Sequence, residues 1–338
     1  MLLLLIAGAG GWLLWERYTG FADMPLSGIQ ADEQVVVERG DSLPVVVEKL
    51  RKLGIDQGQA LEWRLLARQL KADGRLQVGE YELVPGVTPR ELLLAMRDGK
   101  VIQRRFTIVE GWNMHELRAA LARAPLEQKA AKMEDAELMS ALGKPGQHPE
   151  GRFLPETYAY TGSDSDLDVL RRAHAAMEKA LASAWEQRDP ETPLKTAEEM
   201  LTLASIVEKE TGMASERPQI AGLFERRLRV GMRLQTDPTV IYGIGPDYDG
   251  NIRRRDLDTD TPYNTYTRDG LPPTPIAMPG ADALQAVGNP ADGDSLYFVA
   301  IGDGSGRHVF SRTLAEHNAA VQKYVQRYRE NLRSQDAQ

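Results

Sequence analysis

The chain has 338 residues, of which 42% are hydrophobic and 27% charged, and its formal net charge is −8. A chain of this length and composition can form a globular protein of two or more domains. The acidic balance argues against nucleic-acid binding and against a basic surface that attaches to anionic lipid. There is no cysteine, which excludes disulfides and thiolate chemistry.

The first 15 residues, MLLLLIAGAGGWLLW, carry no charge and precede a polar stretch. A membrane-spanning helix needs about 20 apolar residues, so this run is about one turn short, and no basic segment precedes it. We expect residues 1–15 to be a transmembrane anchor whose start lies upstream of Met1, with Trp12 and Trp15 at the membrane–water interface. A cleaved signal peptide and a buried helix are the alternatives.

A linker over residues 16–33 and a small α+β subdomain over residues 34–100 are expected next. The subdomain's predicted elements are a strand at 35–37, a helix after Gly40-Asp41, a helix in 60–74, a strand in 76–86 and a helix from Thr88. This order, with its G-D-S-L turn, resembles a small glycan-binding module of the LysM type. The alternative is an α+β domain that serves packing alone.

The larger region, residues 101–329, is expected to be a second α+β domain, followed by a frayed tail at 330–338. Its predicted elements include a strand at 105–109, a helix capped by Asn113, an aromatic and turn-rich segment at 150–166, a helix from 167 to about 188 and a last helix from 314 to about 333. The sequence GDGSGRH lies between the apolar runs LYFVA and HVF and lacks a Walker lysine, so it is predicted to be a β-hairpin turn.

The segment KTAEEMLTLASIVEKETG contains the most informative carboxylates. It predicts a helix that begins with Thr196 and stops at Gly212. The i, i+3, i+4, i+7 spacing from Leu203 places Glu210 at the end of an apolar stripe. Glu208 lies about 200° around the helix from Glu210. By periodicity alone, Glu208 is expected to point more nearly outward and Glu210 is the unusual residue.

A carboxylate at the end of a buried stripe has two interpretations. In the first, Glu210 reaches past the core to water or to an arginine. In the second, it is a general acid, because apolar surroundings disfavour the charged form and keep a carboxyl protonated near neutral pH. Such a group can protonate a departing sugar oxygen. Most glycosidases need a second carboxylate, but one acid suffices where the substrate brings its own nucleophile.

Two polar loops follow this helix. In RVGMRLQTDPTVIYGIG, the residues Gln235, Thr236 and Asp237 stand immediately before a proline. The second, YNTYTRDGLPPTPIAMPG, is polar and aromatic and then rich in proline. Loops of this kind line sites more often than they merely join elements. Their hydroxyls, amides and aromatic faces suit a sugar-binding groove.

Four motifs together resemble the endolytic murein transglycosylase (YceG-like) family: LASIVEKETG, SERPQIAGLFERRLRVGMRLQTDPTVIYGIG, TPYNTYTRDGLPPTPIAMPG and YFVAIGDGSGRHVFSRTLAEHN. The similarity covers about residues 35–329 in order. It implies a lytic transglycosylase that cleaves nascent peptidoglycan between N-acetylmuramic acid and N-acetylglucosamine and terminates strand elongation. The muramic acid C6 hydroxyl attacks C1 and leaves a 1,6-anhydro end, so this is the case in which one acid suffices.

The resemblance also implies residue roles and a location. The second glutamate of the family's E-K-E-T motif matches Glu210, and Glu208 is the alternative acid. Groove chemistry and the resemblance together suggest these substrate-binding residues: Gln235, Asp237, Tyr263, Asn264, Thr265 and, flanking the site, Glu156. Each could instead lock a loop or be a solvated charge. The family is single-pass in the inner membrane with a periplasmic catalytic domain, although its members usually have a longer, basic-flanked anchor.

Other chemistries are disfavoured. The five histidines show no metal-binding spacing, although His308 and His317 are close enough in sequence to meet in space. No G-x-S-x-G nucleophile elbow is present. We expect no cofactor and no metal. The expected partners are peptidoglycan strands, the membrane and, by family analogy, peptidoglycan synthases. The competing hypothesis is a membrane-anchored scaffold that binds peptidoglycan without cleaving it.

Overall fold

The computed structural model describes residues 16, 17 and 19–336, with side chains up to Glu330. The predicted anchor, residues 1–15, lies outside the described residues. Among the helices that the structure does describe, none is both long and apolar enough to cross a membrane. The chain forms two compact units, one up to Phe106 together with Ala159–Asp164, the other from Thr107–Tyr158 and from Ser165 onward.

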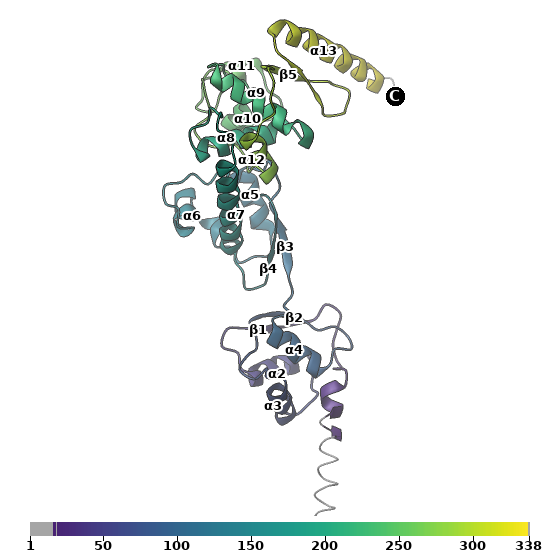
Figure 1. Cartoon of the computed structure of the whole chain (residues 1–338). Helices are drawn as coiled ribbons and strands as arrows, with labels where there is room; N and C mark the ends of the chain where they lie inside the picture. Colours follow the sequence, from purple (N-terminus) through teal and green to yellow (C-terminus); the bar gives the residue numbers. More distant parts are fainter. Residues whose placement is uncertain (1–15, 18, 337–338) are drawn as a thin grey trace, which may run out of the picture. The chain divides into compact units, whose positions relative to one another are not determined.

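The N-terminal unit has the element order that the sequence predicts (Figure 1). Its elements are β1 (Gln34–Val37), α2 (Leu43–Lys52), α3 (Ala60–Gln69), β2 (Gly79–Glu82) and α4 (Pro89–Asp98). β1 and β2 are antiparallel, with Val35 opposite Tyr81, and both of these side chains are buried. Alternating burial along β1 follows from the period of two in a strand that covers a core on one face.

Part of the predicted linker belongs to this core. Residues 19–23 are helical, and Ala22 and Leu26 are buried. The ring of Phe21 packs edge-on against Trp63, with 5.1 Å between ring centroids. Gly58 makes this contact possible, because its φ is +81° and a Cβ there would collide with the Phe21 ring. The segment before the first strand, which the sequence predicts to be a linker, is therefore part of this unit.

The second unit is mostly helical (Figure 1). Its helices are α5 (Met114–Arg123), α6 (Asp135–Ala141), α7 (Asp166–Glu186), α8 (Ala197–Glu210), α9 (Arg217–Arg229), α10 (Asp237–Ile244), α11 (Arg254–Asp258), α12 (Ala281–Gly288) and α13 (Leu314–Asp336). Its short strands are β3 (Arg104–Thr107), which begins in the first unit, β4 (Thr157–Tyr160), β5 (Tyr297–Ala300) and β6 (His308–Ser311). With helices and small antiparallel sheets, the chain is α+β as predicted.

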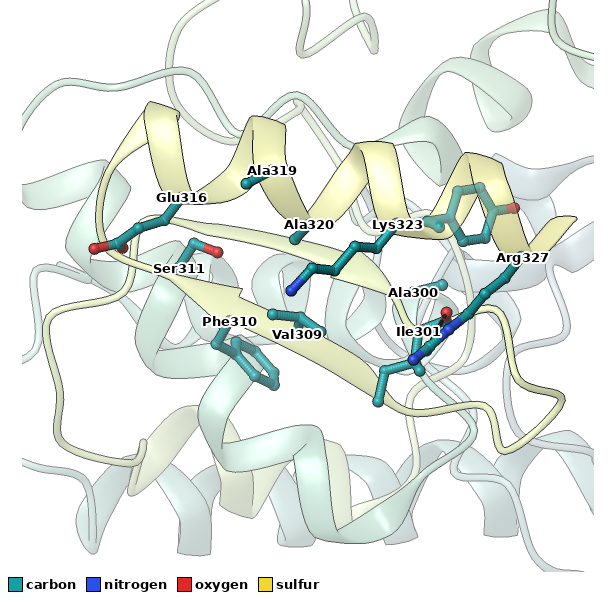
Figure 2. A pocket seen from close by; sticks show the side chains of 11 residues that line it. Ala300, Ile301, Val309, Phe310, Ser311, Glu316, Ala319, Ala320, Lys323 and Arg327 are labelled. Atoms are coloured by element: carbon teal, nitrogen blue, oxygen red, sulfur yellow. Dashed lines mark hydrogen bonds between the residues drawn. The ribbon is translucent and has the colours of Figure 1, made fainter.

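Two details of the strands bear on the sequence analysis. β4 lies inside the segment 150–166, which the sequence presents only as turn-rich. The hairpin predicted around GDGSGRH is confirmed: β5 and β6 are antiparallel, and the Ile301 amide donates to the Arg307 carbonyl across the turn at 2.8 Å. α13 packs against both strands of this hairpin (Figure 2).

Helix α8 forms the centre of the second unit. Every residue from Met200 to Val207 is buried, and α7, α9 and α12 pack around it. The polar residues in this stretch are satisfied locally, since the Ser205 hydroxyl donates to the Thr202 carbonyl and accepts from the Ile276 amide. A helix that is buried all round is held rigidly by its neighbours. Its last residue, Glu210, is therefore placed by the whole core.

A buried carboxyl outside α8 also ties elements of this unit together. Glu150 is 2% exposed and accepts the Met114 amide, at the start of α5, on both oxygens at 3.1 Å. The Tyr242 hydroxyl of α10 donates to it at 3.0 Å. Burial raises the pKa of Glu150 from 4.5 to about 7. The folded protein therefore holds a proton here that the unfolded chain releases.

The stability of the fold should consequently fall between pH 4.5 and 7, because only the unfolded state loses this proton in that range. The pKa difference corresponds to about 3 kcal/mol. We expect Glu150→Gln to remove the share of this pH dependence that Glu150 contributes, and to raise the free energy of unfolding relative to the wild type at pH 8. Urea unfolding at a series of pH values measures it, with the exposed Glu156→Gln as control. Identical pH slopes in wild type and Glu150→Gln would contradict the prediction.

Candidate active site

A cavity of about 360 Å³ opens at the end of α8. Its wall combines two acids, one buried arginine, an amide, a histidine and apolar or aromatic side chains: Glu210, Asp237, Arg227, Gln235, His317, Tyr266, Tyr297, Phe298 and Leu314. They come from α8, α9, the start of α10, a loop before α12, β5 and the start of α13. Such a mixture of aromatic surface and convergent polar groups is typical of a small-molecule or sugar site.

Glu210 is the last residue of α8. The helix ends there, two residues before the predicted Gly212, because Thr211 is extended with φ −144°. This end lets the Glu210 side chain leave the buried core and reach the cavity, where it is half-buried. The hydroxyl of Thr236 donates a hydrogen bond to Glu210 Oε1.

The electrostatics of Glu210 favour its protonated form near neutral pH. Burial is the largest cause and raises its pKa from 4.5 to about 7. The hydrogen bond from Thr236 and the charge of Arg227 lower the pKa, while the neighbouring Asp237 carboxylate raises it. Near pH 7 the Glu210 carboxyl is therefore partly protonated and partly ionised, so it can both donate a proton and take one back.

Arg227 is the fixed positive charge of the cavity. It is 6% exposed, and its Nε donates to the Leu296 carbonyl at 2.7 Å while Nη1 donates to the Leu234 carbonyl. The guanidinium carbon lies 5.7 Å from the centroid of the Tyr297 ring. A guanidinium held in this way cannot swing toward solvent, so its charge stays beside Glu210.

The loop before α10 is fixed by the second polar loop. Gln235 has a left-handed backbone, φ +47°, and its amide donates to the Thr265 carbonyl at 3.2 Å. The amide of Thr236 donates to the Thr265 hydroxyl at 3.1 Å, and that hydroxyl also pairs with Thr239 at 2.8 Å. A non-glycine residue persists in this backbone region only where its surroundings hold it. These bonds aim the Thr236 hydroxyl at Glu210.

Asp237 and Tyr266 form a second pair in the cavity wall. The Tyr266 hydroxyl donates to Asp237 Oδ1 at 2.6 Å, and both side chains line the cavity. Asp237 is the first residue of α10, where its charge also suits the helix N-terminus. The contact holds the Asp237 carboxylate in place beside Glu210.

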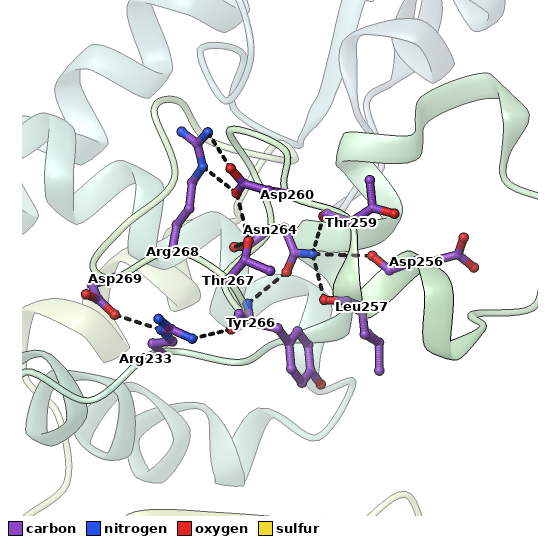
Figure 3. Close-up of polar contacts among 10 residues, drawn as sticks. All are labelled: Arg233, Asp256, Leu257, Thr259, Asp260, Asn264, Tyr266, Thr267, Arg268 and Asp269. Carbon is purple, nitrogen blue, oxygen red and sulfur yellow. Dashed lines mark hydrogen bonds and ion pairs between the residues drawn. The ribbon is translucent and has the colours of Figure 1, made fainter.

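Asn264 organises the loop that carries Tyr266 (Figure 3). Its side chain is 1% exposed, and its amide nitrogen donates to three backbone carbonyls, those of Asp256, Leu257 and Thr259. Its oxygen accepts the Tyr266 amide at 2.8 Å. The hydrogen bonds of this side chain thus connect α11 to the loop that ends at the cavity.

The remaining predicted substrate residues lie away from the cavity lining. Thr265 is buried in the hydroxyl cluster described above. The Tyr263 hydroxyl bonds to Thr274 at 2.8 Å, and its ring packs against Tyr242. Glu156 is exposed and stands immediately before β4. Its backbone carbonyl accepts a hydrogen bond from the Ile108 amide. Of the predicted substrate-binding residues, Gln235 and Asp237 share the cavity with Glu210.

The expectation that Glu208 points outward is wrong. Its side chain is 4% exposed, and Arg217 donates to it at 3.0 Å while the Gly280 amide donates to its other oxygen at 2.9 Å. Because the middle of α8, Met200 to Val207, is buried all round, helical periodicity does not separate an inner from an outer face there. Glu208 does not line the cavity. It is a buried partner of Arg217 that joins the end of α8 to α9 and to the chain before α12.

The two histidines do not form a pair. His308 Nδ1 contacts Glu216 Oε2 at 2.7 Å, whereas the His317 ring stacks on Tyr297 at 5.4 Å. No cluster of three or more potential metal ligands occurs among the residues that the structure describes.

Sequence reasoning missed several cavity residues, namely Arg227, Tyr266, Tyr297, Phe298, Leu314 and His317. Arg227 stands in the run ERRLR, where nothing in the sequence separates it from its neighbours. Tyr266 was within the YNTYTRDG loop already singled out, so its aromatic ring was an available signal. The residues from β5 and α13 reach the cavity only through tertiary packing.

Comparison with known proteins shows the family of this chain. A model of the YceG-like family matches residues 35–323. The chain belongs to the YceG-like family. An endolytic murein transglycosylase of Bacillus subtilis (strain 168) is 29% identical over 323 residues, which cover 89% of this chain and 88% of that one. An endolytic murein transglycosylase of Streptococcus pneumoniae (strain D39) is 27% identical over 74% of this chain and 51% of its own length.

The fold of this YceG-like chain is also similar to a solved structure. A 2.6 Å crystal structure of a yceG-like protein from Listeria monocytogenes aligns with a TM-score of 0.54 at 27% identity. The alignment covers 86% of this chain and 99% of that one. The α+β architecture described above is thus shared across most of the family member's length.

The neighbours of Glu210 should move its pKa in opposite directions. Thr236→Val removes a hydrogen bond to the carboxylate and should raise the pKa, whereas Asp237→Asn removes a nearby negative charge and should lower it. NMR titration of ¹³C-labelled glutamate carboxyl groups measures both shifts. The exposed Glu156 signal serves as internal control. Movement of both variants in the same direction would refute this account of the site's electrostatics.

Proposed function

We propose that this YceG-like chain is a lytic transglycosylase that cleaves the β-1,4 bond between N-acetylmuramic acid and N-acetylglucosamine in nascent peptidoglycan. Glu210 is the proton donor. The observation that carries the proposal is its half-buried carboxyl, with a pKa raised to about 7, at the wall of a partly aromatic cavity. The relatives named endolytic murein transglycosylase support this class of reaction.

The reaction begins with proton transfer. Glu210 gives its proton to the glycosidic oxygen as the bond from that oxygen to C1 of the muramic acid breaks, which frees the 4-hydroxyl of the next sugar. The muramic acid C6 hydroxyl then attacks C1, and its proton passes to the Glu210 carboxylate. The donor is restored, no water is consumed, and the glycan ends in a 1,6-anhydro sugar.

Side chains around Glu210 stabilise its ionised form after proton transfer and its protonated form before it. After the first transfer, the Glu210 carboxylate is stabilised by the hydrogen bond from Thr236 and by the fixed charge of Arg227. Before it, burial and the charge of Asp237 keep Glu210 protonated. Asp237 is occupied by the hydroxyl of Tyr266, which favours an electrostatic role for it over that of a nucleophile.

Substrate contacts are proposed for the cavity's aromatic and polar side chains. A sugar ring packs against the aromatic face of Tyr266, while Gln235 offers an exposed amide. The imidazole of His317 lines the same cavity. A ring nitrogen that faces the cavity can accept or donate a hydrogen bond to a bound sugar.

The location of the reaction is part of the proposal. Residues 1–15 anchor the chain in the inner membrane, so that the catalytic unit acts in the periplasm on strands as they are made. Peptidoglycan synthases, which produce those strands, are the proposed protein partners. The α+β unit before the catalytic unit is proposed to hold glycan in the manner of a LysM module. Support comes from the uncharged N-terminal run and the strand–helix–helix–strand order.

The decisive variants are at the two glutamates of α8. Glu210→Gln keeps a similar shape without a proton to donate, and turnover should fall by about 10²-fold or more. Glu208→Gln breaks a buried ion pair and should lower stability, but the folded fraction should retain turnover. Products from purified, uncrosslinked glycan strands are to be counted by mass spectrometry, and circular dichroism gives the folded fraction.

The same digestion separates this reaction from its rivals. Anhydro ends indicate a lytic transglycosylase, reducing ends would indicate hydrolysis, and intact strands bound to wild-type protein would indicate a scaffold. Full turnover in folded Glu210→Gln, with loss in Glu208→Gln, would reverse the two assignments.

Activity should also follow the proton on Glu210. Because the donor must be protonated and its pKa is raised to about 7, kcat/KM should be level below that pH and fall about tenfold per pH unit well above it. Initial rates between pH 5 and 9 measure this limb. A profile that stays flat to pH 9 would remove Glu210 from the role of acid.

A further inference from the structure

A second hollow, of about 520 Å³, lies between α13 and the hairpin β5–β6 (Figure 2). Its sides are apolar, from Ile301 and Val309 on the hairpin. The middle of α13 contributes only the small side chains of Ala319 and Ala320, which do not fill the space between the helix and the hairpin. Nothing in the catalytic scheme above uses this groove.

The groove lies next to the catalytic cavity on helix α13. Ala320, which follows the cavity residue His317 by about one helical turn, lines the groove. On α13, His317 lines the cavity, and Lys323 and Arg327 line the groove further along. The two hollows are therefore neighbours along α13.

The far end of the groove is positively charged in a chain whose net charge is −8. Lys323 is exposed, and no hydrogen bond or ion pair joins its ammonium to the part of the chain that the structure describes. Arg327 is exposed as well, and one of its nitrogens donates to the Ile301 carbonyl at 3.1 Å, which holds the guanidinium over the groove. The groove's acid, Glu316, instead accepts the amides of Arg312 and Thr313 near the cavity end.

The distances match one part of the proposed substrate. At 1.5 Å per residue, Lys323 is about 9 Å and Arg327 about 15 Å along the helix axis from His317. An extended peptide of five residues spans about 17 Å. Peptidoglycan carries a short peptide with free carboxylates on each muramic acid, which is the sugar whose C1 must lie beside Glu210.

We propose that this groove binds the acidic peptide branch of the muramic acid held in the catalytic cavity. The peptide's small side chains pack against Ile301 and Val309, and its carboxylates pair with Lys323 and Arg327. The proposal rests on the function proposed above and adds a specificity to it: strands that still carry their peptides are preferred over bare glycan.

The test compares two substrates with the purified full-length chain: uncrosslinked strands with intact peptides, and the same strands stripped of peptide by an amidase. In Lys323→Glu/Arg327→Glu, the KM for peptide-bearing strands should rise about tenfold, the effect of losing two exposed charge pairs. Cleavage of stripped strands should stay at the wild-type rate. The KM difference should shrink as salt is added.

A matched control lies on the same helix. Arg329 is exposed and does not line the groove. Arg329→Glu reverses one charge of α13, as each of the two groove substitutions does, and should leave the KM values for both substrates unchanged. Ala320→Phe fills the groove without changing its charge and should also raise the KM for peptide-bearing strands alone. Equal KM values for the wild type, the double variant and Ala320→Phe would overturn the groove while leaving the catalytic proposal intact.

A binding measurement covers the case in which no strand is cleaved. A synthetic disaccharide pentapeptide and the same disaccharide without peptide are titrated onto the full-length chain by calorimetry. Tighter binding of the pentapeptide form, lost in Lys323→Glu/Arg327→Glu, supports the groove even if the catalytic proposal fails. Equal affinity for both ligands refutes the groove. Sedimentation tests the other occupant: concentration-dependent dimerisation that Ala320→Phe abolishes would show that a second copy of the chain fills the groove, and would also refute the proposal.

Discussion

The buried helix α8 is the constraint on which the second unit depends. Because its middle is covered on every side, its end can neither tilt nor slide, and the carboxyl of Glu210 emerges at one fixed point of the cavity. The same burial that places the group also raises its pKa. The position of the Glu210 carboxyl and its affinity for a proton thus have one physical origin, burial. The hydrogen bond from Thr236 lowers its pKa, and Asn264 fixes the loop that carries Tyr266.

The sequence was informative where local chemistry decides structure. Caps and periodicity located the helices, and the glycine-rich turn between two apolar runs predicted the hairpin β5–β6. It was weaker where tertiary packing decides. β4 was hidden in a turn-rich segment, and Phe21 belongs to a core although its neighbours show no sustained period. Isolated short strands depend on partners that a local pattern does not contain.

The site shows the same division. Glu210 was singled out by its place after an apolar stripe and by the match to the family motif, but the stripe argument was incomplete because Glu208 is buried too. What distinguishes the two is their partners: an arginine neutralises Glu208, whereas Glu210 faces a cavity. Arg227 lies on α9 and His317 on the much later α13, and both reach the glutamate through tertiary packing, so no spacing rule could have joined them to it.

The carboxyl of Glu150, which does not line the cavity, has a consequence for the conditions in which the protein works. It and Glu210 both gain their protons near neutrality. Mild acidification therefore protonates Glu210 at the cavity. In the same pH range it protonates Glu150, which removes a buried negative charge from the folded protein. The contribution of Glu150 to stability is therefore largest at the pH values at which Glu210, the proposed proton donor, carries its proton.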